Sequence, residues 1–556
     1  MSNKEIESIC GDLPSSNKLE AIKDNPNYVF DSDISFNPLT LFDVEGNSVT
    51  VRSLIECAYY VNGGWRLDIP STINENFLAY IGVLGIGSLF LVIYFLRKKR
   101  LNLNFKLKIF NKVKANKNVM NFSIALILFF QQRILFDYVS IKSQKLKTFV
   151  DEYIALTSNV QFFKNLDFNA GGDWGGSYSI YLTSGPISAI GSVIGWNIFD
   201  NFTYSRISNF YWIIFLQLIF IVLYKIYFKW DVKFLLLSIS FIFLLIPWWQ
   251  GVLFSLGEFA SVVLFTNACF IYQKSSKFSF LLFGISIFFG KLLTLLSFIG
   301  FFIFKFIEEK KIKKSIYDLT FFIIPLILWL VLVAINYDAG TTLDYLQSQY
   351  DLIISHQSSG LDTVENQSNQ NLFEKIKDSE YSNWNLYDKT RLLLLPLLFL
   401  YLLLKNKITI NERFNSLAYP LIGAVSLPLI WFWFLSGTKW MRYSQHFTII
   451  CILSIFVFIN ENIFKYPLDK LFVVLFLVLL FDDSKFLIYP AVLISLLFFI
   501  KKYNKEKYFK LIIVLFLSLN YLIPFTESEN QYKIFYIENC SENLLNTECK
   551  NNYFQE

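Results

Sequence analysis

The sequence predicts an all-α protein, a polytopic bundle of transmembrane helices, and three observations predict it. Hydrophobic residues make up 54% of the 556-residue chain, which has 61 phenylalanines and a mean hydropathy of +0.43. This composition lies outside the range of soluble globular proteins. Apolar runs near the length of a membrane-spanning helix recur along the chain, and basic residues gather in some of the segments between them. Most of the chain is therefore expected to lie in a lipid bilayer.

A helix needs roughly 20 apolar residues to cross about 30 Å of hydrocarbon. By this measure the chain contains about 12–14 spans, because runs that are short or interrupted by polar residues are still expected where helices shield one another from lipid. The runs are residues 77–96, 119–139, 210–228, 234–249, 252–272, 278–306, 316–335, 392–404, 414–435, 447–459, 471–481, 486–500 and 511–525.

The orientation follows from the basic segments, because Lys and Arg in short loops remain on the cytoplasmic side. Residues 97–117 carry nine basic residues and no acid. With this segment inside, alternation also places three other basic segments inside, provided that residues 278–306 form a hairpin that turns near Lys291: 310–314, 405–413 and 501–507. The acidic loop 337–388 and the tail from residue 526 are then outside.

The predicted division of the chain follows this alternation. Residues 1–19 lack the pattern of a secretory signal peptide, so the first span, 77–96, is expected to export the tail before it as a reverse anchor. The segments are an exported N-terminal tail or small appended domain (1–75), an extra span with the basic loop (76–118), a core (119–335) whose first exported loop is 139–209, an acidic exported loop (336–390), C-terminal spans (391–525) and an exported tail (526–556).

The six cysteines fit this map. Two lie in apolar runs, where a buried thiol is the expected state: Cys269 and Cys451. The other four lie in the exported tails, where disulfides can form, although spacing alone leaves their pairing open: Cys10 with Cys57, and Cys540 with Cys549. The sequence has no Gly-rich nucleotide motif, and its basic residues mark loops instead of forming a stripe, so nucleic acid is not an expected partner.

The first exported loop, residues 139–209, is polar, and a polar ligand is the expected reason for it. Its residues 148–156 have helical spacing, with Thr148 as a candidate N-cap and the acidic pair Asp151-Glu152 in the first turn. A glycine-rich loop at 169–176 separates this helix from an apolar segment, 187–198, that is expected to form a second interfacial helix.

The order of these features resembles the GT-C glycosyltransferases, polytopic enzymes that take sugars from polyprenyl-phosphate carriers. The resemblance covers roughly residues 146–272 and rests on four features: Asp151-Glu152-Tyr153 with Ala155, then Ser184-Gly185-Pro186, Gly195 and Arg206. The chain departs from the family pattern in its extra N-terminal tail and span. It also has Gly185-Pro186 where many members have two prolines or His-Pro.

The resemblance implies an integral protein of the bacterial inner membrane whose active site faces the periplasmic or extracellular side. Its expected partners are membrane lipids, a polyprenyl-phosphate-linked sugar donor and a lipid- or glycan-type acceptor. The implied activity is sugar transfer with inversion, of the mannosyl- or aminoarabinose-transferase type. The sequence identifies neither the sugar nor the acceptor, and the need for a divalent cation stays open.

The chemistry assigns roles to individual residues. Because the acceptor hydroxyl loses a proton as it attacks the anomeric carbon, a carboxylate is expected as general base: by the resemblance Asp151, with Glu152 as second candidate. The departing lipid phosphate needs positive charge or hydrogen-bond donors. The candidates are Lys291, Arg442 and His446, and by the resemblance Arg206 is a further substrate-binding candidate. Glu258, in an apolar run, resembles the second acidic position of some members, which arranges the acceptor or a metal.

Each candidate also has an ordinary structural interpretation. Asp151-Glu152 can be the solvated face of a surface helix, Lys291 can reach the membrane interface, and His446 can be a satisfied buried imidazole. Two other classes of function remain open. A transporter or flippase of a lipid-linked sugar would place ionisable or helix-breaking residues near the middle of several spans. A non-catalytic assembly subunit would use the exported tails and the acidic loop.

Overall fold

The computed structural model describes residues 39–42, 48–51, 117–145, 148–165, 185–199, 201–244, 250–254, 256–309, 312–336, 343–344, 347, 386–407, 412–435, 441–464, 466–480, 509–510, 512–514, 517 and 536–537. The chain divides into two compact units, residues 1–86 and 87–556. In the first, strand β1 (Leu39–Phe42) pairs antiparallel with β2 (Ser48–Val51), with Leu39 opposite Val51.

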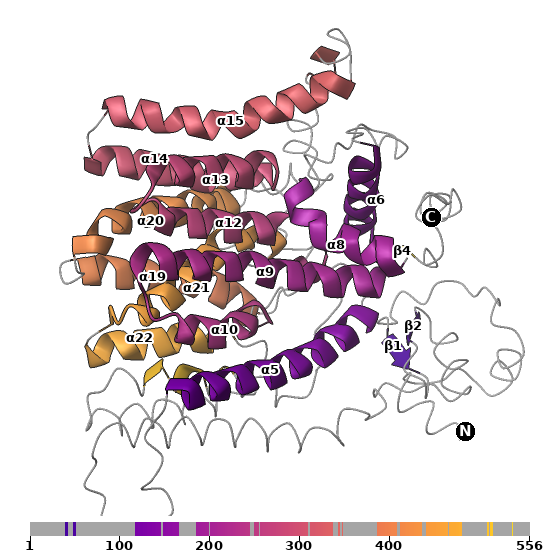
Figure 1. Ribbon diagram of the computed structural model, residues 1–556, viewed down its shortest axis with the longest axis horizontal. Helices are drawn as coiled ribbons and strands as arrows, with labels where there is room; N and C mark the ends of the chain where they lie inside the picture. The colour runs from indigo at the N-terminus through magenta and orange to yellow at the C-terminus, as the bar shows by residue number, and fades with distance from the viewer. Residues whose placement is uncertain are drawn as a thin grey trace, which may run out of the picture. The chain divides into compact units, whose positions relative to one another are not determined.

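The second unit is a bundle of α-helices (Figure 1), which confirms the predicted fold class. Four described helices, α5, α9, α15 and α20, are long and apolar enough to cross a membrane, and α8, α12, α13 and α21 are shorter apolar helices. The α-helices are α5 (Lys117–Lys145), α6 (Val150–Asn165), α8 (Pro186–Phe199), α9 (Phe202–Phe228), α10 (Lys233–Leu244), α11 (Gln250–Leu253), α12 (Glu258–Ile271), α13 (Ser276–Phe288), α14 (Leu295–Glu309), α15 (Ile312–Asn336), α19 (Leu386–Lys407), α20 (Glu412–Ile430), α21 (Gln445–Asn460) and α22 (Pro467–Val478). Two short 3₁₀-helices, η3 (Leu292–Thr294) and η5 (Met441–Ser444), and a π-helix, η4 (Trp431–Leu435), lie between them.

Helix α9 holds helix α8 in close contact. The Asn201 side chain accepts a hydrogen bond from the Thr203 backbone N–H and so caps the start of α9. A Cβ added to Gly191 or Gly195 of α8 would lie within 3 Å of α9 atoms, so only glycine permits this approach. The predicted helix at 187–198 is confirmed.

The helices α13 and α14 form the predicted hairpin. The ring of Phe280 contacts Phe302, and the ring of Phe283, further along α13, contacts Phe298, earlier in α14. This order means that the two helices run antiparallel, and the turn between them contains Lys291. The condition for the predicted alternation of loops at this point is therefore met.

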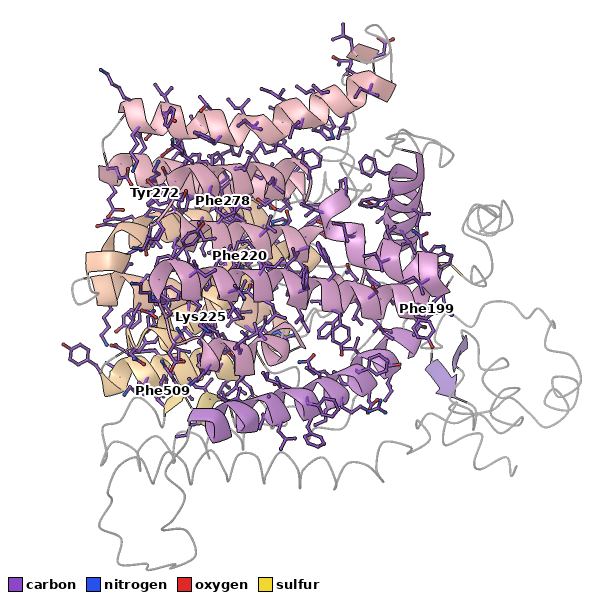
Figure 2. All side chains as sticks on the ribbon, in the orientation of Figure 1. Phe199, Phe220, Lys225, Tyr272, Phe278 and Phe509 are labelled. Atoms are coloured by element: carbon purple, nitrogen blue, oxygen red, sulfur yellow. The ribbon has the colours of Figure 1, made fainter. Side chains whose placement is uncertain are left out.

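The two ends of the bundle carry different chemistry. At the C-terminal end of α12, the Tyr272 hydroxyl donates to Glu309 Oε1 at 2.5 Å, and Lys305 nearby forms a buried ion pair with Asp318 at 3.1 Å. Figure 2 places Tyr272 toward one end of the bundle, the end where the basic segment 310–314 follows α14. Glu258 begins α12, so it lies at the opposite end of that helix.

The segment before α6 pairs with the C-terminal tail. Strand β3 (Thr148–Phe149) is antiparallel to β4 (Tyr536–Ile537), with Thr148 opposite Ile537. The start of the first loop and the C-terminal tail are therefore paired in one two-stranded sheet. The predicted N-cap at Thr148 is wrong, because α6 begins only at Val150 and Thr148 belongs to the strand.

The two cysteines in apolar helices are confirmed as buried and free: Cys269 and Cys451. The four cysteines of the tails lie outside the described residues, as do most of the acidic loop 336–390 and the predicted span 77–96.

Candidate functional site

Glu152 and Arg206 form a buried ion pair that joins α6 to α9. Arg206 donates from Nε to Glu152 Oε1 and from Nη2 to Oε2, both at 2.7 Å, and from Nη1 to the Ser143 carbonyl oxygen at 2.7 Å. The two side chains are only 2% and 3% exposed. Such a two-pronged contact fixes direction as well as distance. It therefore sets the rotation of α6, whose second residue is Asp151.

A short segment, residues 252–258, connects this ion pair to the rest of the site. The Phe254 ring lies 5.1 Å from the Arg206 guanidinium, a cation–π distance. One turn further along α9, Asn209 Nδ2 donates to the Val252 carbonyl oxygen at 2.8 Å. At the far end of the segment, the Leu256 carbonyl oxygen accepts from Lys291 Nζ at 3.1 Å. Arg206 and Lys291, which are 85 residues apart in the sequence, thus both contact this segment.

Glu258 and Lys291 form the second ion pair, with 3.4 Å between Glu258 Oε1 and Lys291 Nζ. Glu258 is fully buried, whereas Lys291 is 12% exposed. Glu258 stands in the first turn of α12, where the helix dipole favours a negative charge, and Gly257 before it has a φ of 90° that suits glycine. An anion approaching this pair therefore meets the cation first.

The motif Gly185-Pro186 lies directly against the turn that carries Lys291. The Gly185 backbone N–H donates to the Gly290 carbonyl oxygen at 2.7 Å, and the Ile187 N–H donates to the Phe289 carbonyl oxygen at 3.0 Å. On the neighbouring turn of α8, Ser188 Oγ donates to the Gly257 carbonyl oxygen at 3.2 Å. The start of α8 is thereby held against the residues that directly precede Lys291 and Glu258.

Replacing Gly185 with alanine is expected to disturb this junction. The added Cβ would lie 2.4 Å from the Phe289 carbonyl carbon and oxygen, which are backbone atoms and cannot rotate away. Overpacking of this kind costs about 1–3 kcal/mol. Thermal unfolding in detergent measures the loss. Tyr204→Phe on the exposed part of α9 is the control, and an unchanged melting temperature for the Gly185 variant would contradict the contact.

A chain of hydroxyl groups leads from Lys291 to His446. The Lys291 backbone N–H donates to Ser261 Oγ at 2.9 Å, Ser261 Oγ lies 3.1 Å from Thr294 Oγ1, and Thr294 Oγ1 lies 3.5 Å from His446 Nδ1. His446 is fully buried in the first turn of α21. The sequence analysis did not select Ser261 or Thr294 as site residues. Both are polar residues inside apolar runs, and such residues can mark a functional site.

The structure thus places five of the predicted site residues in two groups. It brings together Glu152 with Arg206, and Glu258 with Lys291 and His446. Asp151 lies in α6 and Arg442 lies in η5, four residues before His446; their side chains lie outside the described part of the structure. The described residues contain no group of three or more His, Cys, Asp or Glu side chains that is placed to hold a metal ion.

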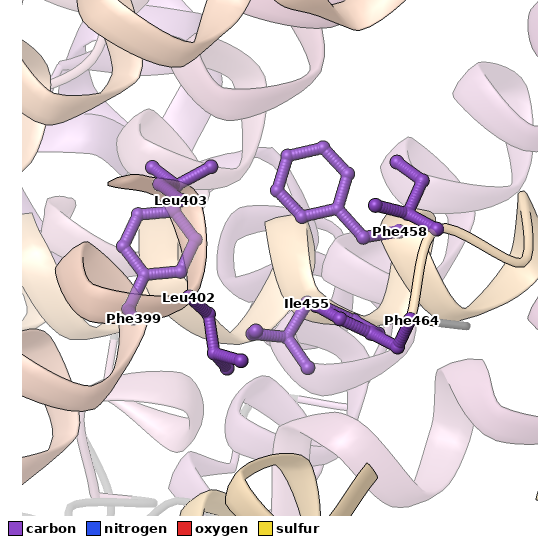
Figure 3. A pocket seen from close by; sticks show the side chains of 7 residues that line it. Phe399, Leu402, Leu403, Ile455, Phe458 and Phe464 are labelled. Atoms are coloured by element: carbon purple, nitrogen blue, oxygen red, sulfur yellow. The ribbon is translucent and has the colours of Figure 1, made fainter. Parts of the chain in front are cut away.

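An apolar pocket lies away from this site, between α19 and α21 (Figure 3). It is a shallow, partly open gap that is too narrow to hold a water molecule. Its lining is entirely apolar: Phe399, Leu402, Leu403, Ile455, Phe458, Ile463 and Phe464. A surface of this kind suits hydrocarbon and offers no group for catalysis.

No protein-family model and no curated protein matches this chain. Two solved structures resemble it. The crystal structure of ArnT from Cupriavidus metallidurans bound to undecaprenyl phosphate has 11% sequence identity and a TM-score of 0.41, covering 72% of this chain and 75% of that one. The same protein in the apo state has 12% identity and a TM-score of 0.38, covering 72% and 76%. At this level, the likeness assigns no function to the chain.

Proposed function

We propose that the protein is a membrane glycosyltransferase that moves a sugar from a polyprenyl-phosphate donor to a lipid- or glycan-type acceptor on the exoplasmic face. The observation that carries the proposal is the buried Glu258–Lys291 pair, in which only the cation reaches the surface. The same segment that supports Lys291 also touches Arg206, the partner of the helix that bears Asp151. Undecaprenyl phosphate, the ligand in one ArnT structure, belongs to the proposed class of carrier.

In the proposed reaction, the acceptor oxygen bonds to the anomeric carbon while the bond from that carbon to the phosphate oxygen breaks. Asp151 takes the proton of the acceptor hydroxyl, and the lipid phosphate departs with the bonding electrons. Lys291 stabilises the negative charge of this leaving group, with Arg442 as a second cation. Attack opposite to the leaving group inverts the anomeric centre.

The geometry supports a division of labour within the acidic pair. Both carboxylate oxygens of Glu152 accept hydrogen bonds from Arg206, so Glu152 is a poor proton acceptor. We assign Glu152 and Arg206 to positioning α6, and Asp151 to the proton transfer. Glu258 keeps Lys291 in place before an anion arrives.

The middle of the bundle favours an enzyme over a transporter. There, between α9 and α12, the side-chain amides of Gln217 and Asn267 hydrogen-bond to each other at 2.7 and 3.2 Å, and the Tyr224 hydroxyl donates to Asn267. A fully bonded amide pair fixes two helices together. This supports a rigid bundle with its chemistry at one end.

Replacing Lys291 with methionine tests the proposal. We expect undecaprenyl phosphate to bind about 10- to 100-fold more weakly, because a hydrogen bond to a charged group is lost. The measurement is binding of the lipid to the purified protein in detergent. Because the single change leaves Glu258 buried without its cation, the double variant Lys291→Met with Glu258→Gln is measured in parallel.

Lys314→Met is the matched control, since Lys314 is 46% exposed and pairs with Glu309 at the other end of the bundle. The control is expected to bind the lipid as the unmodified protein does. Equal binding by the Lys291 variants and the control would refute the assignment of Lys291.

A further inference from the structure

We propose that His446 is a neutral imidazole with its proton on Nδ1, and that Nε2 accepts a hydrogen bond from a hydroxyl of the donor sugar. The identity of that hydroxyl rests on the proposed function, whereas the position of the proton rests on the hydrogen-bond network alone. This role differs from the phosphate contact that the sequence predicts for His446.

The network fixes the direction of each hydrogen bond. Ser261 has one hydroxyl hydrogen, and Ser261 Oγ donates it to the Ser286 carbonyl oxygen. Towards Thr294, Ser261 can therefore only accept, so Thr294 gives its single hydroxyl hydrogen to Ser261. Thr294 Oγ1 then meets His446 Nδ1 as an acceptor, and the ring nitrogen must carry the hydrogen.

The other ring nitrogen is left with a lone pair. Burial favours the uncharged imidazole, because a charged ring would lose its hydration. Among the described residues, His446 Nε2 has no hydrogen-bond partner, although the side chain is fully buried. It is one of 19 buried side-chain nitrogen and oxygen atoms in the described residues that lack a hydrogen-bond partner, and it lies on the ring to which the hydroxyl chain from Lys291 leads, so a ligand bound beside Lys291 can complete it.

The chemistry of Nε2 selects the ligand. An acceptor atom needs an O–H or N–H donor, and an ionised phosphate ester supplies neither. A sugar hydroxyl supplies one. The hydroxyl chain joins His446 to the turn of Lys291, and in a lipid-phosphate sugar the ring hydroxyls lie next to the phosphate. Lys291 would therefore contact the phosphate of the donor lipid, and His446 would contact a neighbouring hydroxyl of its sugar.

The ring is also held in place. Ser297 Oγ donates to the His446 backbone carbonyl oxygen at 3.3 Å, and Thr448 Oγ1 donates to the Ser444 carbonyl oxygen at 2.8 Å in the same turn. A fixed backbone and a fixed Nδ1 direct the lone pair of Nε2 along one line. Such preorganisation suits the recognition of one particular hydroxyl.

Nitrogen NMR of the full-length protein with ¹⁵N-labelled histidine tests the tautomer directly. The chain has two histidines, so His356→Gln leaves one imidazole signal. We expect the neutral form with the proton on Nδ1. Thr294→Val, which removes the acceptor, is expected to abolish that preference, and Thr294→Ser to keep it. A ring protonated on Nε2 in the unmodified protein would overturn the inference, as would an unchanged spectrum in the valine variant.

Ligand binding tests the hydroxyl. Replacing His446 with leucine is expected to weaken binding of a sugar-bearing polyprenyl phosphate about tenfold and to leave binding of undecaprenyl phosphate unchanged. Lys291→Met is expected to weaken both. Equal losses for both lipids in the His446 variant would overturn the hydroxyl subsite. Failure of the unmodified protein to bind either lipid would refute the proposed function, and with it the identity of the hydroxyl, while NMR would still decide the tautomer.

Discussion

Replacing Asp151 with asparagine is expected to lower sugar transfer by about 10²–10⁴-fold, the usual contribution of a general base. Asparagine keeps the size of the side chain but cannot take a proton at neutral pH, so the acceptor hydroxyl attacks without assistance. The measurement is transfer from a radiolabelled polyprenyl-phosphate sugar in membranes that hold equal amounts of each variant. Donor binding is expected to stay within about twofold, because Lys291 is unchanged.

The matched control is Asp137→Asn in α5. Asp137 is 31% exposed and forms an ion pair with Arg133 on the helix surface. Its loss is expected to leave transfer unchanged. Unimpaired transfer by the Asp151 variant would remove Asp151 from the mechanism. Loss of transfer together with a lower melting temperature would instead assign Asp151 to the structure of α6.

Replacing Arg206 with methionine is expected to destabilise the protein by about 3–5 kcal/mol, because it leaves the Glu152 carboxylate buried without its cation. The Glu152–Arg206 pair is almost completely excluded from solvent, and both carboxylate oxygens depend on it. The double variant with Glu152→Met removes both charges and is expected to recover most of this stability. Thermal unfolding in detergent measures each step.

The double variant also separates stability from activity. Without the two-pronged contact, α6 is no longer fixed in rotation, so transfer is expected to stay low after stability returns. Arg133→Met is the control for stability, since its ion pair is exposed and contributes about 0–1 kcal/mol. An Arg206 variant as stable as this control would contradict the buried pair, and full transfer by the double variant would contradict its positioning role.

Much of the fold could be predicted from local sequence. The apolar runs predict helices because backbone polar groups must be satisfied inside hydrocarbon, and the described runs are helical. The polar turn at Lys291 inside a long apolar run predicts a hairpin, which the structure contains. The error at Thr148 came from pairing with Tyr536–Ile537, a contact between segments nearly 390 residues apart. Local propensity carries no information about such a partner.

The residues of the candidate site could also be predicted only in part from the sequence. The sequence analysis selected Glu152 and Arg206 for separate roles, as a second candidate base and as a substrate-binding residue, and the structure bonds them to each other. Ser261 and Thr294 were not selected, because a hydroxyl in an apolar helix most often bonds to its own backbone. Only the packing of α12 against the α13–α14 turn brings them between Lys291 and His446.

Hydropathy and charge along the chain are enough to predict a membrane protein, its helices, the turn at Lys291 and the residue types able to do chemistry, because each of these depends on local sequence. The packing of the helices adds which charges pair with each other and which hydroxyl donates to which oxygen, and it leaves Nε2 of His446 without a partner among the described residues. Hydropathy is a property of each residue by itself. A hydrogen bond needs two groups within about 3 Å of each other, and only the folded chain brings distant residues that close.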